Sequence, residues 1–156
     1  MISAESFFEN TSRFYEFLIR DYNYSLFRKL ESQLSYSIIY KGNTRAVQIY
    51  FEPMENYSSV MIYRLSSNEE IPDWDDTLNS LPLHRAISKK NKNTFRPSKN
   101  DIILELEKNA ILLKRFCNDI LKGDTWIEYP EIKAPPIRVY DPESREWKII
   151  NNIDEI

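Results

Sequence analysis

Cys117 and His84 are the single cysteine and the single histidine of this sequence, and together they could supply a nucleophile and its general base. A catalytic cysteine needs a lowered pKa, which a helix N-terminus or a neighbouring cation provides. Cys117 instead falls near the C-terminal end of a predicted helix, where the helix dipole raises a thiol pKa, and on the apolar side of that helix. We therefore expect Cys117 to be a buried structural residue and His84 to lie on the surface or in a loop.

The acidic stretch SSNEEIPDWDD, residues 66–76, holds carboxylates that could bind a cation or act as acid and base. Its aspartates Asp73, Asp75 and Asp76 resemble part of a calcium loop but lack the spacing, the glycine and the final glutamate of an EF-hand. No pair of acids is marked by its context as a glycosidase pair. We expect a solvated acidic loop with no metal and no cofactor, although a small enzyme that combines His84 with a carboxylate remains an alternative.

The basic stretch RAISKKNKNTFRPSK, residues 85–99, follows the acidic one and contains no acid. Its cations and Phe95 could bind single-stranded nucleic acid, so an RNA-binding module that uses residues 85–99 is a lesser alternative. The net charge of −3 and the pI near 5.3 do not favour nucleic acid as a partner. If both blocks face solvent, they create a dipolar surface that would steer and orient a charged protein.

Gly42 and Gly123 are the only glycines in the sequence, and they lie far apart. Phosphate-binding loops and nucleophile elbows need glycine, so we do not expect those motifs. One cysteine cannot form an internal disulfide, which fits a reducing compartment. The first residues, MISAESFFEN, lack the basic segment of a signal peptide, and no apolar run approaches the ~20 residues that cross a bilayer. We expect a cytoplasmic protein that does not bind membranes.

The elements that position these residues follow from the hydrophobic periodicity. Apolar side chains at helical spacing predict a helix over residues 4–21, and Ser3 is placed to cap its first turn. The period then changes to two, most clearly where Val47, Ile49 and Phe51 share one face. The predicted strands lie at 24–30, 35–42, 45–52 and 59–66. Their short connections require antiparallel pairing.

A second helical pattern covers residues 101–122 and has a broad apolar stripe that includes Leu113 and Cys117. Ser98 and Asp101 have the spacing of a capping box at its start. Gly123 is predicted to end the helix in a left-handed conformation. A helix that is apolar over so much of its circumference should lie deep, across the sheet.

We predict one α+β domain over residues 1–156: an antiparallel sheet of about four or more strands, with an N-terminal helix and a long C-terminal helix packed on it. Residues 66–100 form a predicted irregular charged loop, in which TLNSLPLHRAIS is compatible with a short helix broken at Pro82. Around the turn DPES, residues 137–150 predict a C-terminal hairpin.

Four segments of this chain, FYEFLIRDYNYSL, VQIYFEP, VMIYRL and LEKNAILLKRFCNDILKGD, resemble in their order a group of small, uncharacterised bacterial proteins. Some members of that group are similar to the immunity proteins of polymorphic or contact-dependent toxin systems. The resemblance implies an α+β domain that binds and neutralises a protein partner. It assigns no functional residue.

Aromatic residues are the second signal for binding, because Tyr and Trp dominate the hot spots of protein interfaces. A second packed face of the sheet would explain equally well the aromatics at Tyr50, Tyr57, Tyr63, Trp74, Trp126 and Tyr129. We predict a non-enzymatic protein-binding module, of the immunity or inhibitor type, whose partner is a toxin domain. The expected contact residues are Trp74 and the surrounding acids Glu69, Glu70, Asp73, Asp75 and Asp76.

Overall fold

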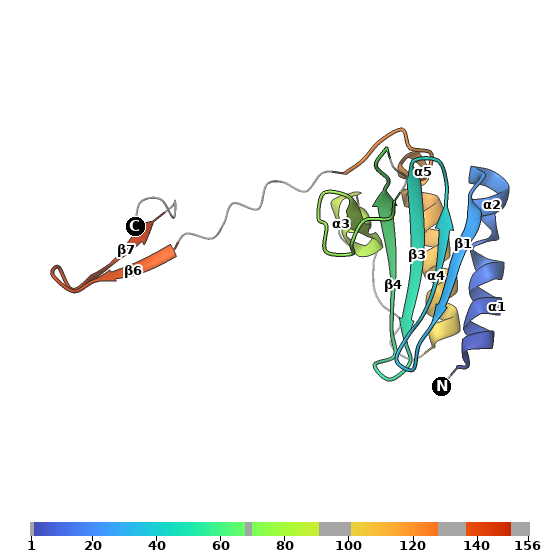
Figure 1. Ribbon diagram of the computed structural model, residues 1–156, viewed down its shortest axis with the longest axis horizontal. Helices are drawn as coiled ribbons and strands as arrows, with labels where there is room; N and C mark the ends of the chain where they lie inside the picture. The colour runs from blue at the N-terminus through green and yellow to red at the C-terminus, as the bar shows by residue number, and fades with distance from the viewer. Residues whose placement is uncertain (1, 68–69, 91–100, 128–136, 151–156) are drawn as a thin grey trace.

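The computed structural model describes residues 2–67, 70–90, 101–127 and 137–150 (Figure 1). The chain is an α+β protein built on one five-stranded antiparallel sheet in the order β1-β2-β3-β4-β5, with helices packed on one face. The strands are β1 (Ser25–Glu31), β2 (Tyr36–Lys41), β3 (Arg45–Glu52), β4 (Tyr57–Arg64) and β5 (Ser80–Pro82). The fold class predicted from the sequence is therefore confirmed.

The N-terminal helical region consists of α1 (Ala4–Phe14) and α2 (Glu16–Tyr22), whereas the sequence predicts a single helix. Ser3 caps α1 as predicted, because its Oγ accepts a hydrogen bond from the backbone N–H of Ser6 at 3.1 Å. Tyr15 separates the two helices with φ −101° and ψ 11°, and it is completely buried. The break therefore coincides with the burial of an aromatic ring, and neither glycine nor proline marks it in the sequence.

The core lies between the sheet and these helices. Alternate residues of β3 point toward the helices, and Val47 and Ile49 are both completely buried. Pairing places Val47 between Tyr40 of β2 and Ile62 of β4, so one layer of apolar side chains runs across three strands. The opposite face of the sheet carries a smaller buried cluster of Ile39, Ala46 and Tyr63.

The second helical region is α4 (Ile102–Phe116) followed by the short α5 (Asn118–Leu121), so the predicted helix over 101–122 is interrupted at Cys117. Leu113 and Cys117 are completely buried, which confirms the position of the apolar stripe. Gly123 has φ +83° and ends the region in the left-handed conformation, as predicted.

Asp101 is the N-cap of α4. Its Oδ1 accepts the backbone N–H groups of Ile103 and Leu104 at 3.0 and 3.3 Å. The prediction that Asp101 occupies the last position of a capping box is therefore wrong, because an aspartate can itself satisfy the free donors of the first turn. Ser98, the other half of that prediction, lies outside the described residues.

Residues 80–90 are regular, although the sequence predicts a loop over 66–100. Strand β5 pairs with β4, and α3 (Leu83–Lys90) follows it directly. Pro82 ends β5 and precedes the helix, so the expectation of a helix broken at Pro82 is wrong. A residue without an N–H is tolerated at the end of an edge strand. Most of the basic stretch falls on residues 91–100, outside the described residues.

The predicted C-terminal hairpin over 137–150 is present. Strands β6 (Ile137–Asp141) and β7 (Glu146–Ile150) pair with each other in a separate two-stranded sheet. The rings of Tyr140 and Trp147, which are direct cross-strand partners, lie 5.4 Å apart between centroids. Lys148 Nζ lies 2.7 Å from Asp141 Oδ2 and adds an ion pair to the hairpin.

Candidate partner-binding site

Trp74 lies on the connection between β4 and β5, within residues 72–80, which we name the Trp74 loop. Trp74 is 75% exposed, and the flanking Asp73 and Asp75 are exposed as well. Leu78, on the same loop, is 63% exposed. The loop therefore presents an indole ring, an aliphatic side chain and two carboxylates to solvent.

Asp76 holds this loop from within. Its Oδ1 accepts the backbone N–H groups of Leu78 and Asn79, each at 3.2 Å, and its Oδ2 accepts the side-chain amide of Asn79 at 2.9 Å. The Asn79 side-chain amide, together with these backbone N–H groups, holds the pKa of Asp76 below its ordinary value. The carboxylate is therefore engaged in shaping the turn, in the manner of an Asx turn.

Ser80 closes the loop at the base of the sheet. Its Oγ donates to the backbone carbonyl of Asp73 at 2.7 Å, and its backbone N–H donates to the carbonyl of Asp76 at 2.8 Å. Ser80 is buried and is the first residue of β5, where it pairs with Tyr63. Ser80 thus ties both ends of the turn of residues 73–76, which carries Trp74, to the edge strand of the sheet.

Arg64, the last residue of β4, connects the loop to the neighbouring strand. Its Nε donates to Asn79 Oδ1 at 3.2 Å and its guanidinium also donates to the carbonyl of Leu78 at 3.1 Å. The indole N–H of Trp126 donates to the same Leu78 carbonyl at 2.9 Å. Arg64 lies over the Trp126 ring, 5.3 Å from its centroid, so the segment after α5 supports the loop from a second direction.

Arg45 anchors the segment that carries Trp126. Its guanidinium lies 5.1 Å from the Trp126 ring centroid and donates to the carbonyls of Ile120 and Thr125, both at 3.1 Å. Arg45 is buried, and this burial lowers its pKa. Because a buried guanidinium needs acceptors for its donors, these contacts fix the chain after α5 against the end of β3.

The structure brings several of the predicted contact residues together. Glu70, Asp73 and Asp76 line one open pocket of about 330 Å³ with Arg64 and Asn79. Trp74 and Asp75 project from the adjoining part of the Trp74 loop, whereas Glu69 lies outside the described residues.

Arg64 and Asn79 are functional neighbours that sequence reasoning missed. The hydrogen bonds of Arg64 connect residues that are far apart in the sequence. Its partner Leu78 lies 14 positions away and its partner Asn79 lies 15 positions away. The one available signal was the arginine at the end of a strand that leads into an acidic segment.

Cys117 and His84, the two candidate catalytic residues, occupy different environments. Cys117 is completely buried at the junction of α4 and α5, as predicted. His84 lies in the first turn of α3 and is exposed overall, but partial desolvation of its ring and the charge of Arg85 lower its pKa. Within the described ranges, no group of three or more His, Cys, Asp or Glu side chains could hold a metal ion.

The aromatics that the sequence leaves open between partner binding and a second packed face differ widely in exposure. Tyr63 is 2% exposed and its hydroxyl donates to Gln48 Oε1 at 2.6 Å, whereas Tyr57 is 51% exposed. Trp126 packs against the main core and contributes its N–H to the loop contact described above. Tyr129 lies outside the described residues. Trp74 is thus the most exposed of the aromatics predicted for binding that the structure describes.

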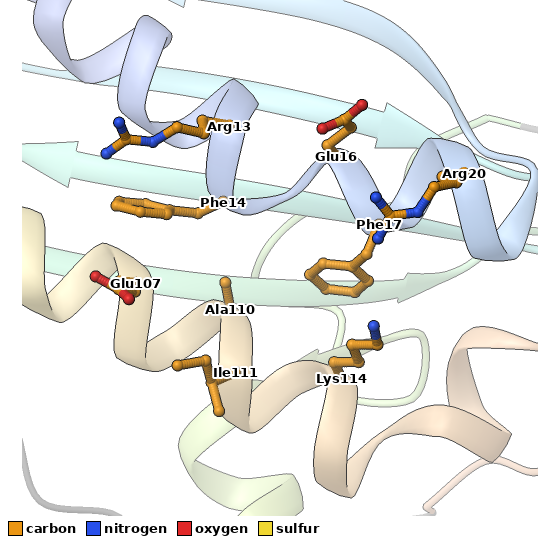
Figure 2. Close-up of a pocket in the computed structure, with 9 residues that line it drawn as sticks. All are labelled: Arg13, Phe14, Glu16, Phe17, Arg20, Glu107, Ala110, Ile111 and Lys114. Carbon is orange, nitrogen blue, oxygen red and sulfur yellow. The ribbon is translucent and has the colours of Figure 1, made fainter.

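A groove between the N-terminal helices and α4 is a second concave surface (Figure 2). It has a volume of about 310 Å³ and is lined by Arg13, Phe14, Glu16, Phe17, Arg20, Glu107, Ala110, Ile111 and Lys114. At one end, Asp21 accepts from both Arg20 and Lys114 at 3.3 Å, and these cations lower its pKa. The lining charges therefore compensate one another, which makes the groove a weaker site for a charged partner.

Chemically, the Trp74 loop offers a flat aromatic surface with adjacent anions, which suits binding to a cationic surface of another protein.

None of the described helices has the length and apolar character that spanning a membrane requires. No protein-family model, curated protein or solved structure matches this chain.

Proposed function

We propose that this chain is a non-enzymatic protein-binding module that uses the Trp74 loop to engage a partner with a basic surface. The observation that carries the proposal is a tryptophan that is 75% exposed on a loop whose backbone is closed by internal hydrogen bonds. A large ring in water on an ordered loop is unfavourable for an isolated protein and favourable at an interface, where the ring becomes buried.

Order in the loop favours tight binding. Association loses free energy when a loop must become ordered, and a loop that is already ordered avoids much of that loss. Asp76 and Ser80 supply this order through their hydrogen bonds inside the loop. The anchor, Trp74, can therefore enter a recess of the partner without prior rearrangement of the backbone.

Charge defines the partner further. Exposed Asp73 and Asp75 flank Trp74, and Glu70 lies on the rim of the adjoining pocket. Carboxylates around an aromatic anchor favour a partner that presents an apolar recess surrounded by Lys or Arg side chains. Association with such a partner is accelerated by electrostatic steering and becomes slower at high salt.

The specific form of the proposal is an immunity or inhibitor protein that neutralises a cognate toxin domain in the cytoplasm. It is supported by the resemblance in element order to immunity proteins of toxin systems and by the acidic, aromatic character of the Trp74 loop. In this role the loop would cover a cationic surface of the toxin, such as one that binds an anionic substrate.

The experiment is a binding assay with the products of the genes adjacent to the one that encodes this chain. Wild type should form a stable complex with one of them, and Trp74→Ala should weaken it by about 30-fold or more, the effect of removing a hot-spot tryptophan. Trp147→Ala is the matched control, because Trp147 is 59% exposed but lies on the β6–β7 hairpin. An equal loss of affinity in the two variants, or the absence of a complex with the product of any adjacent gene, would contradict the proposal.

A further inference from the structure

The two edges of the five-stranded sheet are built differently. Strand β5 is three residues long, ends at Pro82, and buries Ser80 and Leu81. Strand β1, at the other edge, is seven residues long and every one of its residues is exposed. Proteins protect sheet edges with short strands and proline, so β5 is a protected edge and β1 lacks these two protections.

Strand β1 exposes apolar side chains as well as backbone. Leu26, Phe27 and Leu30 are 47%, 43% and 43% exposed. In an edge strand the N–H and C=O groups of alternate residues point away from the neighbouring strand, where they can pair with an added strand. Among the residues that the structure describes, no further strand pairs with this edge, so it combines outward main-chain hydrogen-bonding groups with apolar side chains on which a partner can pack.

Two adjacent cations occupy the middle of β1. Arg28 pairs with Ile39 and Lys29 with Ile38, so these two side chains lie on opposite faces of the sheet. Lys41 of β2 adds a third cation, because it and Arg28 both lie over the Phe27 ring, at 4.9 and 5.1 Å from its centroid. Each face of the edge therefore offers a cation beside an apolar side chain.

This arrangement disfavours pairing of β1 with a second copy of itself. An antiparallel pair centred on the strand places Arg28 opposite Arg28, or opposite Lys29 when shifted by half a step, and like charges in direct opposition are destabilising. The register shift between Leu26 and Arg28 divides the pairing of β1 into residues 25–26 and 28–31, so a second copy would find no regular run longer than the four residues from Arg28 onward.

We infer that β1 binds an extended segment of another protein by β-strand addition, and that this segment carries two adjacent acidic residues flanked by apolar ones. One acid lies opposite Arg28 and the other opposite Lys29, one on each face, while an apolar neighbour contacts Leu30. Main-chain hydrogen bonds extend the sheet to six strands. This site is separate from the Trp74 loop, so it does not depend on the function proposed above.

The test uses the capped hexapeptide acetyl-VVEEVV-amide as the probe, with the protein of residues 1–156 and detection by amide chemical shifts. We expect saturable binding with shifts that concentrate on β1 and β2. Lys29→Glu should weaken it by about tenfold or more, because an attractive cross-strand pair becomes repulsive. Arg115→Glu, an exposed position on α4, changes the net charge equally and should leave the affinity unchanged.

A second peptide separates strand addition from simple charge attraction. N-methylation of alternate amides of the probe removes main-chain donors but keeps both glutamates, and it should abolish binding. The peptide VVKKVV should not bind. Binding that survives N-methylation, failure of VVEEVV to bind at millimolar concentration, or self-association of the protein through β1 would each overturn the inference. Because Trp74→Ala should not change peptide binding, failure here leaves the proposed function standing.

Discussion

The carboxylate of Asp76 accepts the side-chain amide of Asn79 at 2.9 Å, and this pair closes the turn of residues 76–79, which directly follows the turn that carries Trp74. The other carboxylate oxygen accepts two backbone N–H groups of the same turn. The Asp76 carboxylate therefore orders the part of the Trp74 loop that follows the indole, although the sequence marks it as a residue that contacts the partner. In the proposed complex it acts as a positioning residue, and Asp73 and Asp75 provide the exposed carboxylates.

Replacing Asp76 should loosen the Trp74 loop without unfolding the protein. In Asp76→Ala the backbone N–H groups of Leu78 and Asn79 lose their carboxylate acceptor, so hydrogen exchange at these two amides should become severalfold faster. Amides in the buried strand β3 should keep their wild-type rates. Asp75→Ala is the control, and an equal acceleration in that variant would show that Asp76 has no special part in ordering the loop.

The hairpin of β6 and β7 should depend on pH through Asp141. Lys148, with help from the backbone N–H of Glu143, lowers the pKa of Asp141 from 3.8 to about 2. Since the folded form has the lower pKa, the stabilisation is complete above the ordinary value of 3.8 and is lost as the pH falls through about 2. Carboxyl chemical shifts should show Asp141 titrating near pH 2, and Lys148→Met should move its pKa toward 3.8.

Arg138→Met is the matched control for that titration. Arg138 lies on β6, the strand of Asp141, and its guanidinium lies 5.1 Å from the centroid of the Trp147 ring, but the ion pair with Asp141 is formed by Lys148 of β7. The variant should therefore keep a depressed pKa at Asp141. A shift as large as that of Lys148→Met would assign the effect to general charge near the hairpin.

Local signals in the sequence were sufficient for much of the fold. Ser3 as a cap, the alternation along β3 and the left-handed Gly123 follow from the chemistry of one residue or from a period of two, and all three are confirmed. The breaks at Tyr15 and Cys117 could not be predicted in this way. Both residues continue the apolar stripe of their helix, and the interruption accompanies burial against distant strands.

The candidate site shows the same division. An exposed tryptophan among acids is visible in the sequence, and Trp74 with Asp73 and Asp75 is exposed in the structure. Arg64 could not be identified, because its bonds to Leu78 and Asn79 depend on how β4 and β5 pair. The cationic edge of β1 could not be predicted either, because the weak alternation of this strand does not indicate whether it lies at the edge or in the middle of the sheet.

Gly123, which follows the C-cap of α5, should be difficult to replace by any residue with a side chain. A Cβ at this position, where φ is +83°, would also lie 2.6 Å from Thr44 Oγ1. Gly123→Ala should therefore destabilise the fold by more than the ~1–2 kcal/mol expected from the left-handed backbone alone. Adding Thr44→Ala should restore the part of the free energy of unfolding that is lost through the clash with Thr44. The part lost through the left-handed backbone should remain, and chemical denaturation measures both. Full recovery in the double variant would show that the backbone conformation is not strained.

Leu113 and Ile111 test the placement of α4 on the sheet, because they lie two residues apart on the same helix with opposite exposure. Leu113 is completely buried and Ile111 is 57% exposed. Leu113→Ala should reduce the free energy of unfolding by about 2–5 kcal/mol through lost burial and a cavity. Ile111→Ala should change it by less than about 0.5 kcal/mol, as is usual at the surface. Urea denaturation of both variants gives the comparison, and similar losses would mean that α4 does not present this face to the core.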